Sequence, residues 1–306
     1  VYYIHVFKEK NQILENRSRM KLITFIYKDS KQRVGVICKD DKTVTDLTDT
    51  FYDMNNLISS CSVGELKKYQ KDSDNILLSE TKILAPIPEP KQDIICLGIN
   101  YSEHAEESAR FKNEKFDGKR EYPVYFSKRV NEALKDKGTA HCLNADEKID
   151  YEAELGVIIS KTCRNVSAGN SRDYVFGYTI INDLSARTLQ QKHKQWYYGK
   201  SFDSSCPMGP WIVTADEFDY PPKLKIESRV NSEVRQSSNT GKMIFNIDYI
   251  IEDLSRSMTL KSASIISTGT PAGAGMGFDP PKFLKDGDKV ECEIENIGIL
   301  TTYISK

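Results

Sequence analysis

The sequence predicts an α+β protein in which a curled, mostly antiparallel β-sheet roll dominates, with a small additional domain at the N-terminus. Many short β-like runs, separated by Gly, Pro, Asn and Asp, fill the chain beyond residue 93, and few helical stretches interrupt them. A chain of 306 residues with 39% hydrophobic and 28% charged residues is long enough for one large domain and one smaller domain.

The elements divide the chain into three parts. Residues 1–19 show no clear periodicity and are interpreted as an extension before Met20, a candidate biological start, within a small mixed α/β domain over residues 1–85. Three prolines in five positions predict an extended linker over 86–93, because proline removes a donor and disfavours helix before it. Residues 94–306 form the expected larger domain. The expected strands and helices are strands at 21–27 and 34–38 and helices at 62–69, 101–111, 185–195 and 247–258.

Composition excludes several classes of protein. The formal net charge of −1 argues against a nucleic-acid or membrane-surface partner, since both usually require a basic excess. No apolar run is long enough to span a membrane, and the N-terminus does not resemble a signal peptide. The seven cysteines are scattered, without a C-x-x-C motif, which is typical of reduced thiols. We therefore expect a cytoplasmic protein.

Two carboxylates lie two residues apart in the run from Asp150 to Ile159. On a strand, Glu152 and Glu154 would project from one face while Ala153 and its alternate neighbours face the other. Close carboxylates repel unless a cation lies between them, and Asp183, at the end of another predicted strand, offers a third. An all-oxygen set favours Mg²⁺, or Mn²⁺, over Zn²⁺. The alternative is a solvent-facing acidic strand edge.

Three further segments carry candidate chemistry. His104 and Glu107 stand at i, i+3 of a predicted helix, where the carboxylate can orient an imidazole as a general base; the alternative is a surface ion pair. Lys200, which we expect in a strand, can hold a substrate carboxylate or an oxyanion, or be a solvated lysine. The Gly-rich run 267–277 offers backbone N–H groups and the Thr270 hydroxyl to an anion, or is merely a tight loop.

Taken in order, six blocks of sequence together resemble the fumarylacetoacetate hydrolase family over roughly residues 94–300. The blocks are Asn100-Tyr101-x-x-His104-x-x-Glu107, Pro123-Val124-Tyr125-Phe126-Ser127-Lys128, Asp150-Tyr151-Glu152-x-Glu154-Leu155, Asn182-Asp183-Leu184-Ser185-Ala186-Arg187, Gly199-Lys200-Ser201-Phe202-Asp203 and Thr268-Gly269-Thr270-Pro271-Ala272-Gly273. An ordered set of this kind is far more specific than any single block.

The resemblance implies a role for each matching position. By similarity, the metal ligands are Glu152, Glu154 and Asp183, the catalytic residues are His104, Glu107 and Lys200, and the substrate contacts are Lys200, Thr270, Gln191 and Arg187. A structural role is an alternative for Gln191 and for Arg187. The resemblance also implies a homodimer that acts on a small 2-oxo acid.

The expected reaction follows from the same resemblance. We expect Mg²⁺-dependent cleavage of a C–C bond in an acylpyruvate or an oxaloacetate-like acid, through a metal-stabilised enolate. The alternatives are isomerisation of a 2-hydroxymuconate-like diacid and a relative that binds metal and ligand without turnover. A mere binder would need no base, so the presence of His104 and Glu107 favours an enzyme.

Overall fold

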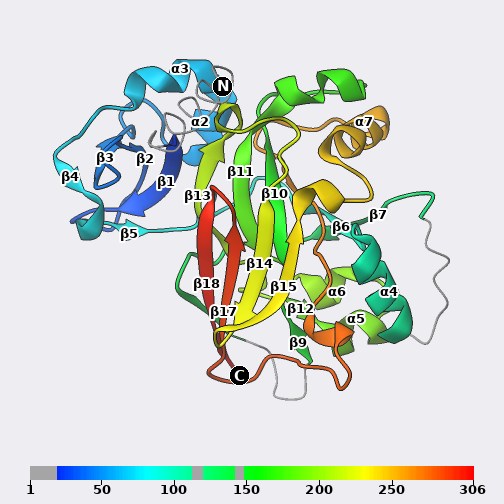
Figure 1. The fold of residues 1–306 in the computed structure, drawn as a ribbon. Coiled ribbons are helices and arrows are strands. Elements are labelled where there is room, and N and C mark those ends of the chain that lie inside the picture. The colour runs from blue at the N-terminus through cyan, green and yellow to red at the C-terminus, as the bar shows by residue number, and fades with distance from the viewer. Residues whose placement is uncertain (1–18, 112–119, 142–147) are drawn as a thin grey trace, which may run out of the picture.

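The structure is a computed structural model that describes residues 19–111, 120–141 and 148–306. Most of the extension expected over residues 1–19 therefore lies outside the described residues. Two sheets dominate the fold, and helices cover their flanks (Figure 1). The expectation of an α+β protein with large, mostly antiparallel sheets is confirmed, while the closure into a roll and the separate N-terminal domain remain predictions.

The larger sheet has eleven strands and runs through most of the chain. Its order is β4-β3-β2-β1-β13-β11-β10-β16-β6-β7, and β5 pairs with β1 beside this path. All of its pairings are antiparallel except the one between β16 and β6. Its strands are β1 (Lys21–Ile26), β2 (Gln32–Ile37), β3 (Thr43–Asp46), β4 (Ile76–Leu77), β5 (Lys82–Ile83), β6 (Ile94–Gly98), β7 (Val124–Lys128), β10 (Ala153–Ile159), β11 (Val175–Asn182), β13 (Met208–Thr214) and β16 (Ile265–Ser267).

The second sheet has five strands in the order β15-β14-β17-β18-β8 and packs against one face of the first. A short pair, β9 with β12, lies beside the end of β10. These strands are β8 (Gly138–His141), β9 (Ile149–Asp150), β12 (Ser185–Ala186), β14 (Lys225–Val230), β15 (Glu233–Asn239), β17 (Lys289–Ile294) and β18 (Gly298–Ser305).

Strand β10 is buried on both faces. Leu155 and Val157 join a cluster with residues of the five-stranded sheet, and Ile158 joins a second cluster with the N-terminal strands and helices. Each buried aliphatic side chain contributes roughly 1.5–3 kcal/mol. A sheet covered on both sides leaves no solvent-facing position for the acids of β10.

The helices form where their apolar spacing meets a cap. Helix α7 (Ile247–Ser257) buries Ile247, Ile250, Ile251 and Leu254, at i, i+3, i+4 and i+7, and the Asn246 side chain caps its first turn. Helix α4 (Ser102–Phe111) buries His104, Ala105 and Ser108. The others are α2 (Met54–Ser60), α3 (Val63–Leu66), α5 (Arg187–Lys192) and α6 (Tyr197–Lys200).

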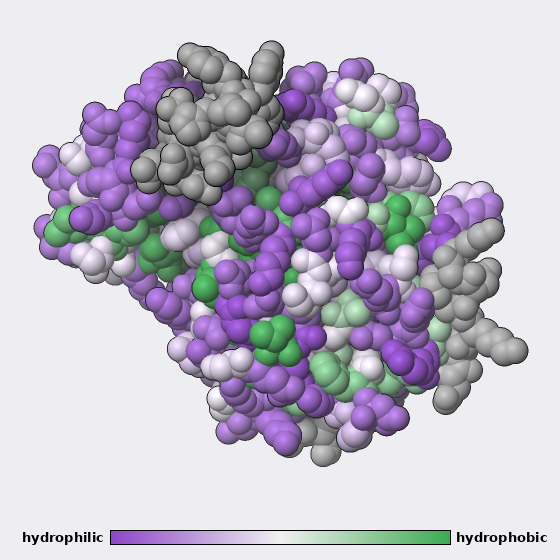
Figure 2. Space-filling model, in the orientation of Figure 1, coloured by the Kyte–Doolittle hydropathy of each residue, from purple (hydrophilic) through white to green (hydrophobic). Residues whose placement is uncertain are grey.

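The expected helices at 62–69, 101–111 and 247–258 are therefore present, the first as α3 with a following 3₁₀ turn. The expected helix at 185–195 is shorter, because Ser185 and Ala186 pair with β9. No helix in the described ranges is both long and apolar enough to cross a membrane. The face of the molecule in Figure 2 is largely hydrophilic, with small separate hydrophobic areas.

Candidate active site

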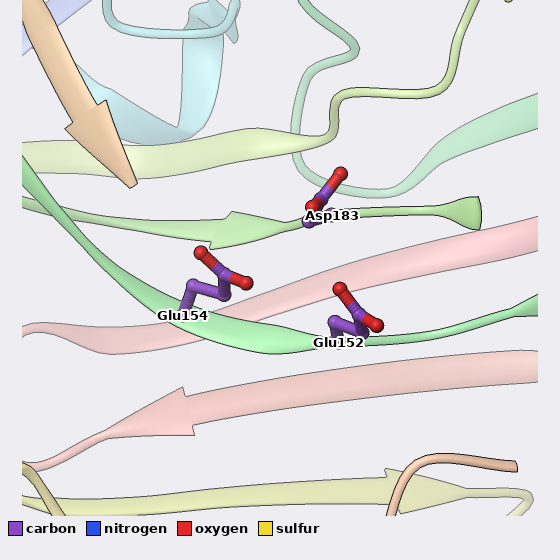
Figure 3. Close-up of side chains that lie close together, drawn as sticks. All are labelled: Glu152, Glu154 and Asp183. Atoms are coloured by element: carbon purple, nitrogen blue, oxygen red, sulfur yellow. The ribbon is translucent and has the colours of Figure 1, made fainter. Parts of the chain in front are cut away.

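Three carboxylates meet where β10 begins and its neighbour β11 ends. Glu152 directly precedes β10, Glu154 lies within it, and Asp183 directly follows β11. The register Ala153↔Asn182 places Asp183 beside Glu152, and the Asp183 backbone N–H donates to the Glu152 carbonyl at 2.9 Å. One carboxylate oxygen from each lies within 4.8 Å of the others, and the three side chains project into one space (Figure 3).

The cluster is buried, so the alternative of a solvent-facing acidic edge is wrong. Glu152, Glu154 and Asp183 are 5%, 1% and 0% exposed. Unpaired charges at such depth are strongly disfavoured, so counter-charges are required nearby.

Cations hold two of the three carboxylates. The Lys200 ammonium lies 2.6 Å from Glu152 Oε2 and 2.5 Å from Asp183 Oδ2, and the Lys128 ammonium lies 2.8 Å from Asp183 Oδ1. Arg187 also donates to Glu152 Oε1. Burial raises the pKa of Glu152, but Arg187 and Lys200 outweigh burial and hold that pKa well below its usual range. The Glu152 carboxylate is therefore held ionised.

Glu154 differs from its neighbours, because no salt bridge among the described residues reaches its carboxylate. It accepts from Ser267 Oγ at 2.5 Å and from the Gly269 backbone N–H at 2.9 Å. Burial, followed by the charges of Asp183 and Glu152, raises its pKa to about 8. A hard divalent cation among the three carboxylates would supply the positive charge that Glu154 lacks, so the donor set fits Mg²⁺ or Mn²⁺.

The expectation that Lys200 lies in a strand is wrong, because it is the last residue of the short helix α6. Four residues carry no detectable helical period, and tertiary contacts set this turn. The Lys200 carbonyl accepts from the Lys128 ammonium at 2.5 Å and from Ser205 Oγ at 3.0 Å. These donors satisfy the helix end that would otherwise be unpaired in the interior.

His104 and Glu107 form a partly buried pair on α4. His104 Nδ1 lies 3.3 Å from Glu107 Oε2, and His104 is 4% exposed. The Gly273 backbone N–H donates to both Glu107 oxygens, at 2.9 and 3.0 Å. Gly273 has a φ of 99°, and a Cβ there would lie 1.9 Å from the Arg235 carbonyl oxygen, so this approach requires glycine. The Gly-rich loop therefore holds the pair in place through Glu107, and the burial of His104 shows that this is not a surface ion pair.

Two of the three carboxylates, Glu152 and Glu154, line one cavity of about 350 Å³ together with His104 and Lys200. Thr270 lies in the same lining, and all five of these side chains are buried. The other lining residues are Leu97, Gly98, Ile99, Ser108, Phe111, Phe126, Arg187, Gln190, Gln191, Lys194, Trp196 and Met276. Glu107 and Asp183 do not line it, because each stands behind a residue that does.

The remaining candidates, Thr270, Arg187 and Gln191, also line the cavity. The polar groups of Thr270 and Arg187 are already hydrogen-bonded within the protein. The Thr270 hydroxyl donates to the Ala153 carbonyl at 2.9 Å and accepts from Gln236 Nε2 at 2.7 Å. Arg187 donates through Nε to Asp150 at 2.9 Å and through one terminal nitrogen to Gln190 at 3.0 Å. Gln191 is exposed at the outer part of the lining.

Sequence reasoning gave no role to three residues of this network. Lys128 and Asp150 stand inside matched blocks, and a buried charged residue leaves no periodic signal that would separate it from a solvated one. Asp150 accepts from the backbone N–H groups of Gly275 and Met276, at 2.6 and 3.1 Å, and so ties the Gly-rich loop to Arg187. Gln190 lines the cavity one position before the predicted Gln191.

A family model, fumarylacetoacetate (FAA) hydrolase C-terminal, matches residues 93–305. The chain belongs to the fumarylacetoacetate hydrolase family. It is 45% identical over 231 residues to the oxaloacetate tautomerase YisK of Bacillus subtilis. The aligned region covers 74% of this chain and 74% of that protein.

Solved structures of this family share the architecture. A fumarylacetoacetate hydrolase from Exiguobacterium antarcticum superposes with a TM-score of 0.75 at 35% identity, over 94% of this chain and 99% of that one. A 2-hydroxyhepta-2,4-diene-1,7-dioate isomerase from Mycobacterium marinum gives a TM-score of 0.71 at 29% identity, over 94% and 98%. The family thus includes a tautomerase, a hydrolase and an isomerase.

Proposed function

We propose that this protein is a divalent-metal-dependent enzyme that enolises a small 2-oxo acid, and that interconversion of the enol and keto forms of oxaloacetate is its main reaction. The observation that carries the proposal is a single cavity lined by His104 and by Glu152 and Glu154 of the buried carboxylate cluster. The similarity to an oxaloacetate tautomerase supports this choice among reactions that share an enolate.

The metal ligands in this proposal are Glu152, Glu154 and Asp183, with Mg²⁺ or Mn²⁺ as the ion. A bound divalent ion would act as a Lewis acid that favours negative charge on the substrate's 2-oxo oxygen.

The chain's own residues complete the site. The Lys200 ammonium already neutralises two carboxylates, and a substrate carboxylate or developing oxyanion beside it would share that charge. The Nδ1 atom of His104 faces Glu107, so Nε2 is left to take a proton from the substrate and return it to another atom. Glu107 keeps the ring oriented, and the Gly273 backbone keeps Glu107 in place.

Cleavage of a C–C bond is the second candidate, because the E. antarcticum relative is named a hydrolase. In that reaction His104 would deprotonate a water that attacks the C4 carbonyl of an acylpyruvate. Isomerisation of a 2-hydroxymuconate-like diacid needs only the proton transfers of the first proposal.

One assay separates these reactions. The enol form of oxaloacetate absorbs in the ultraviolet, and its decay is followed with Mg²⁺ or with EDTA while lactate dehydrogenase and NADH report any pyruvate. A tautomerase speeds the decay without releasing pyruvate beyond the spontaneous rate, whereas decarboxylation, or hydrolysis of acetylpyruvate in a parallel run, releases it. A 2-hydroxymuconate analogue tests the isomerase. Absence of Mg²⁺-dependent turnover on all three would contradict the proposal.

Oxalate tests the site without turnover. It resembles the planar enolate of pyruvate and should bind far more tightly with Mg²⁺ than with EDTA. Equal affinities by calorimetry would contradict a metal site in this cavity, while Mg²⁺-dependent oxalate binding without any turnover would indicate a protein that binds its ligand only.

A further inference from the structure

The cavity described above has an exposed cation in its lining to which the proposed chemistry gives no role. Lys194 lies in its lining and is exposed, whereas the other lining cations, Arg187 and Lys200, are buried. The acids of the cluster already hold those two in ion pairs. Within the described residues, no ion pair or side-chain hydrogen bond reaches the Lys194 ammonium, so its charge is available to a ligand.

The segment that carries Lys194 is held in place. Lys194 has a φ of 62°, a conformation that a residue with a side chain rarely adopts. The His193 backbone N–H donates to the Leu189 carbonyl at 3.1 Å, and the His193 ring packs 4.6 Å from that of Tyr198. A lysine fixed in a sparsely populated conformation at a cavity is a candidate for function.

Trp196 packs the same segment against Phe126 and Gly98, which also line the cavity. Its ring meets Phe126 edge-on, with centroids 5.2 Å apart. A Cβ at Gly98 would lie 2.1 Å from the Trp196 ring, so β6 and the indole approach as closely as they do because residue 98 is glycine. The backbone of Lys194 is therefore fixed two residues from a packed aromatic contact.

Charge is arranged along the cavity in a definite order. The carboxylate cluster and Lys200 occupy the buried part, where a 2-oxo acid end would bind, and Lys194 occupies the exposed part. A ligand that spans the cavity thus meets an unpaired cation at its distal end. Opposite charge at that end strengthens binding, and a neutral end gains nothing from it.

We propose that Lys194 is a specificity-determining residue that binds the distal carboxylate of the substrate, and that the preferred substrates are dianionic 2-oxo acids. The inference rests on the proposed function for the position of the 2-oxo acid end. It adds a residue that would distinguish dianionic from monoanionic 2-oxo acids and that is neither a proposed metal ligand nor part of the histidine pair.

A matched pair of ligands tests the proposal. N-oxalylglycine has an oxalyl end and a distal carboxylate, and N-oxalylglycinamide differs only in its neutral distal amide. Calorimetry with Mg²⁺ should show that wild-type protein prefers the carboxylate by about tenfold or more, the usual effect of a charge-assisted contact. Lys194→Met should remove that preference, and Lys194→Arg should keep most of it. Lys192→Met is the control, because Lys192 is exposed at the end of α5, two residues before Lys194, and does not line the cavity.

Kinetics provide the second readout. Lys194→Met should raise the KM for oxaloacetate by about tenfold and leave kcat nearly unchanged, since the lost contact is made equally in the ground state. A wild-type preference that survives in Lys194→Met, or no preference in wild-type protein, overturns the assignment of Lys194. Wild-type protein that binds neither ligand with Mg²⁺ overturns the proposed function as well. Wild-type binding without turnover contradicts the enzyme but leaves the assignment of Lys194 standing.

Discussion

The two walls of the cavity are built in different ways. The carboxylate wall stands on adjacent strands of a sheet buried on both faces, and the ammonium groups of Lys128 and Lys200 pair with two of its three acids, Glu152 and Asp183. The histidine wall stands on one helix, where Glu107 connects His104 to the backbone N–H of Gly273. The first wall is fixed by strand register and charge, and the second by a few hydrogen bonds. Substitutions should therefore separate binding on one wall from proton transfer on the other.

The largest effect is expected at Glu154. Glu154→Gln should abolish Mg²⁺-dependent turnover, because octahedral Mg²⁺ tolerates the loss of a charged ligand poorly. The fold should be kept, since the amide oxygen can still accept from Ser267 and Gly269. Turnover and circular dichroism provide the measurements, with Glu106→Gln on the exposed face of α4 as control. Near wild-type turnover at modest Mg²⁺ would remove Glu154 from the ligand set.

The next largest effect is expected at the histidine. His104→Ala should lower turnover roughly 10²- to 10⁴-fold, the usual contribution of a positioned acid or base, with Mg²⁺ and oxalate binding nearly intact. Glu107→Ala should lower turnover less, because it orients the ring without transferring the proton. The double variant should lose little more than His104→Ala, since residues that act as a unit are not additive. A wild-type rate in His104→Ala would mean that the base lies elsewhere.

A stability effect is expected behind the carboxylate wall. Lys128→Met should lower the free energy of unfolding by about 3 kcal/mol, the lower end for a broken buried ion pair, because Lys200 still contacts Asp183. Urea unfolding without metal provides the measurement. Lys31→Met, at an exposed turn, should change it by no more than about 0.5 kcal/mol. Equal values for the two variants would show that Lys128 does not stabilise the wall.

The smallest effect concerns α4 itself. Oxalate with Mg²⁺ should slow backbone hydrogen exchange from Tyr101 to Phe111, because a helix held by few contacts gains order when a ligand binds beside it. The β10 backbone, buried before ligand is added, should change little. Comparable slowing in both elements would show that the two walls are equally ordered before binding.

The chain's local patterns predicted the parts of the site that depend on local geometry. Alternation placed Glu152 and Glu154 on one face, and the i, i+3 spacing placed His104 beside Glu107. The patterns could not distinguish Lys128 from a solvated lysine, since its ammonium donates to the carbonyls of Leu184, just after β11, and of Lys200 in α6, which are distant in sequence. They also assigned Lys200 to a strand, because a four-residue helix has too few residues to show a period. Partners chosen by tertiary packing leave no mark in the local pattern.

The same limit applies to the arrangement of the strands. The runs at 21–27 and 34–38 were expected as strands, and β1 and β2 are present there. Local alternation predicts that a segment is a strand, but it does not predict which other strand that segment will pair with. The pairing of β1 with β13, at Lys21↔Val213 and Leu22↔Ile212, joins residues nearly two hundred positions apart.

That pairing has a consequence for solubility. With β1 in place, β13 is an interior strand (Figure 1). A fragment beginning at Ala85 would leave the same strand at the margin of the sheet, with unpaired backbone groups beside apolar Met208 and Ile212. Exposed margins of this kind recruit other chains and promote aggregation. By pairing with β13, β1 therefore protects the sheet that carries the carboxylates from pairing with other chains.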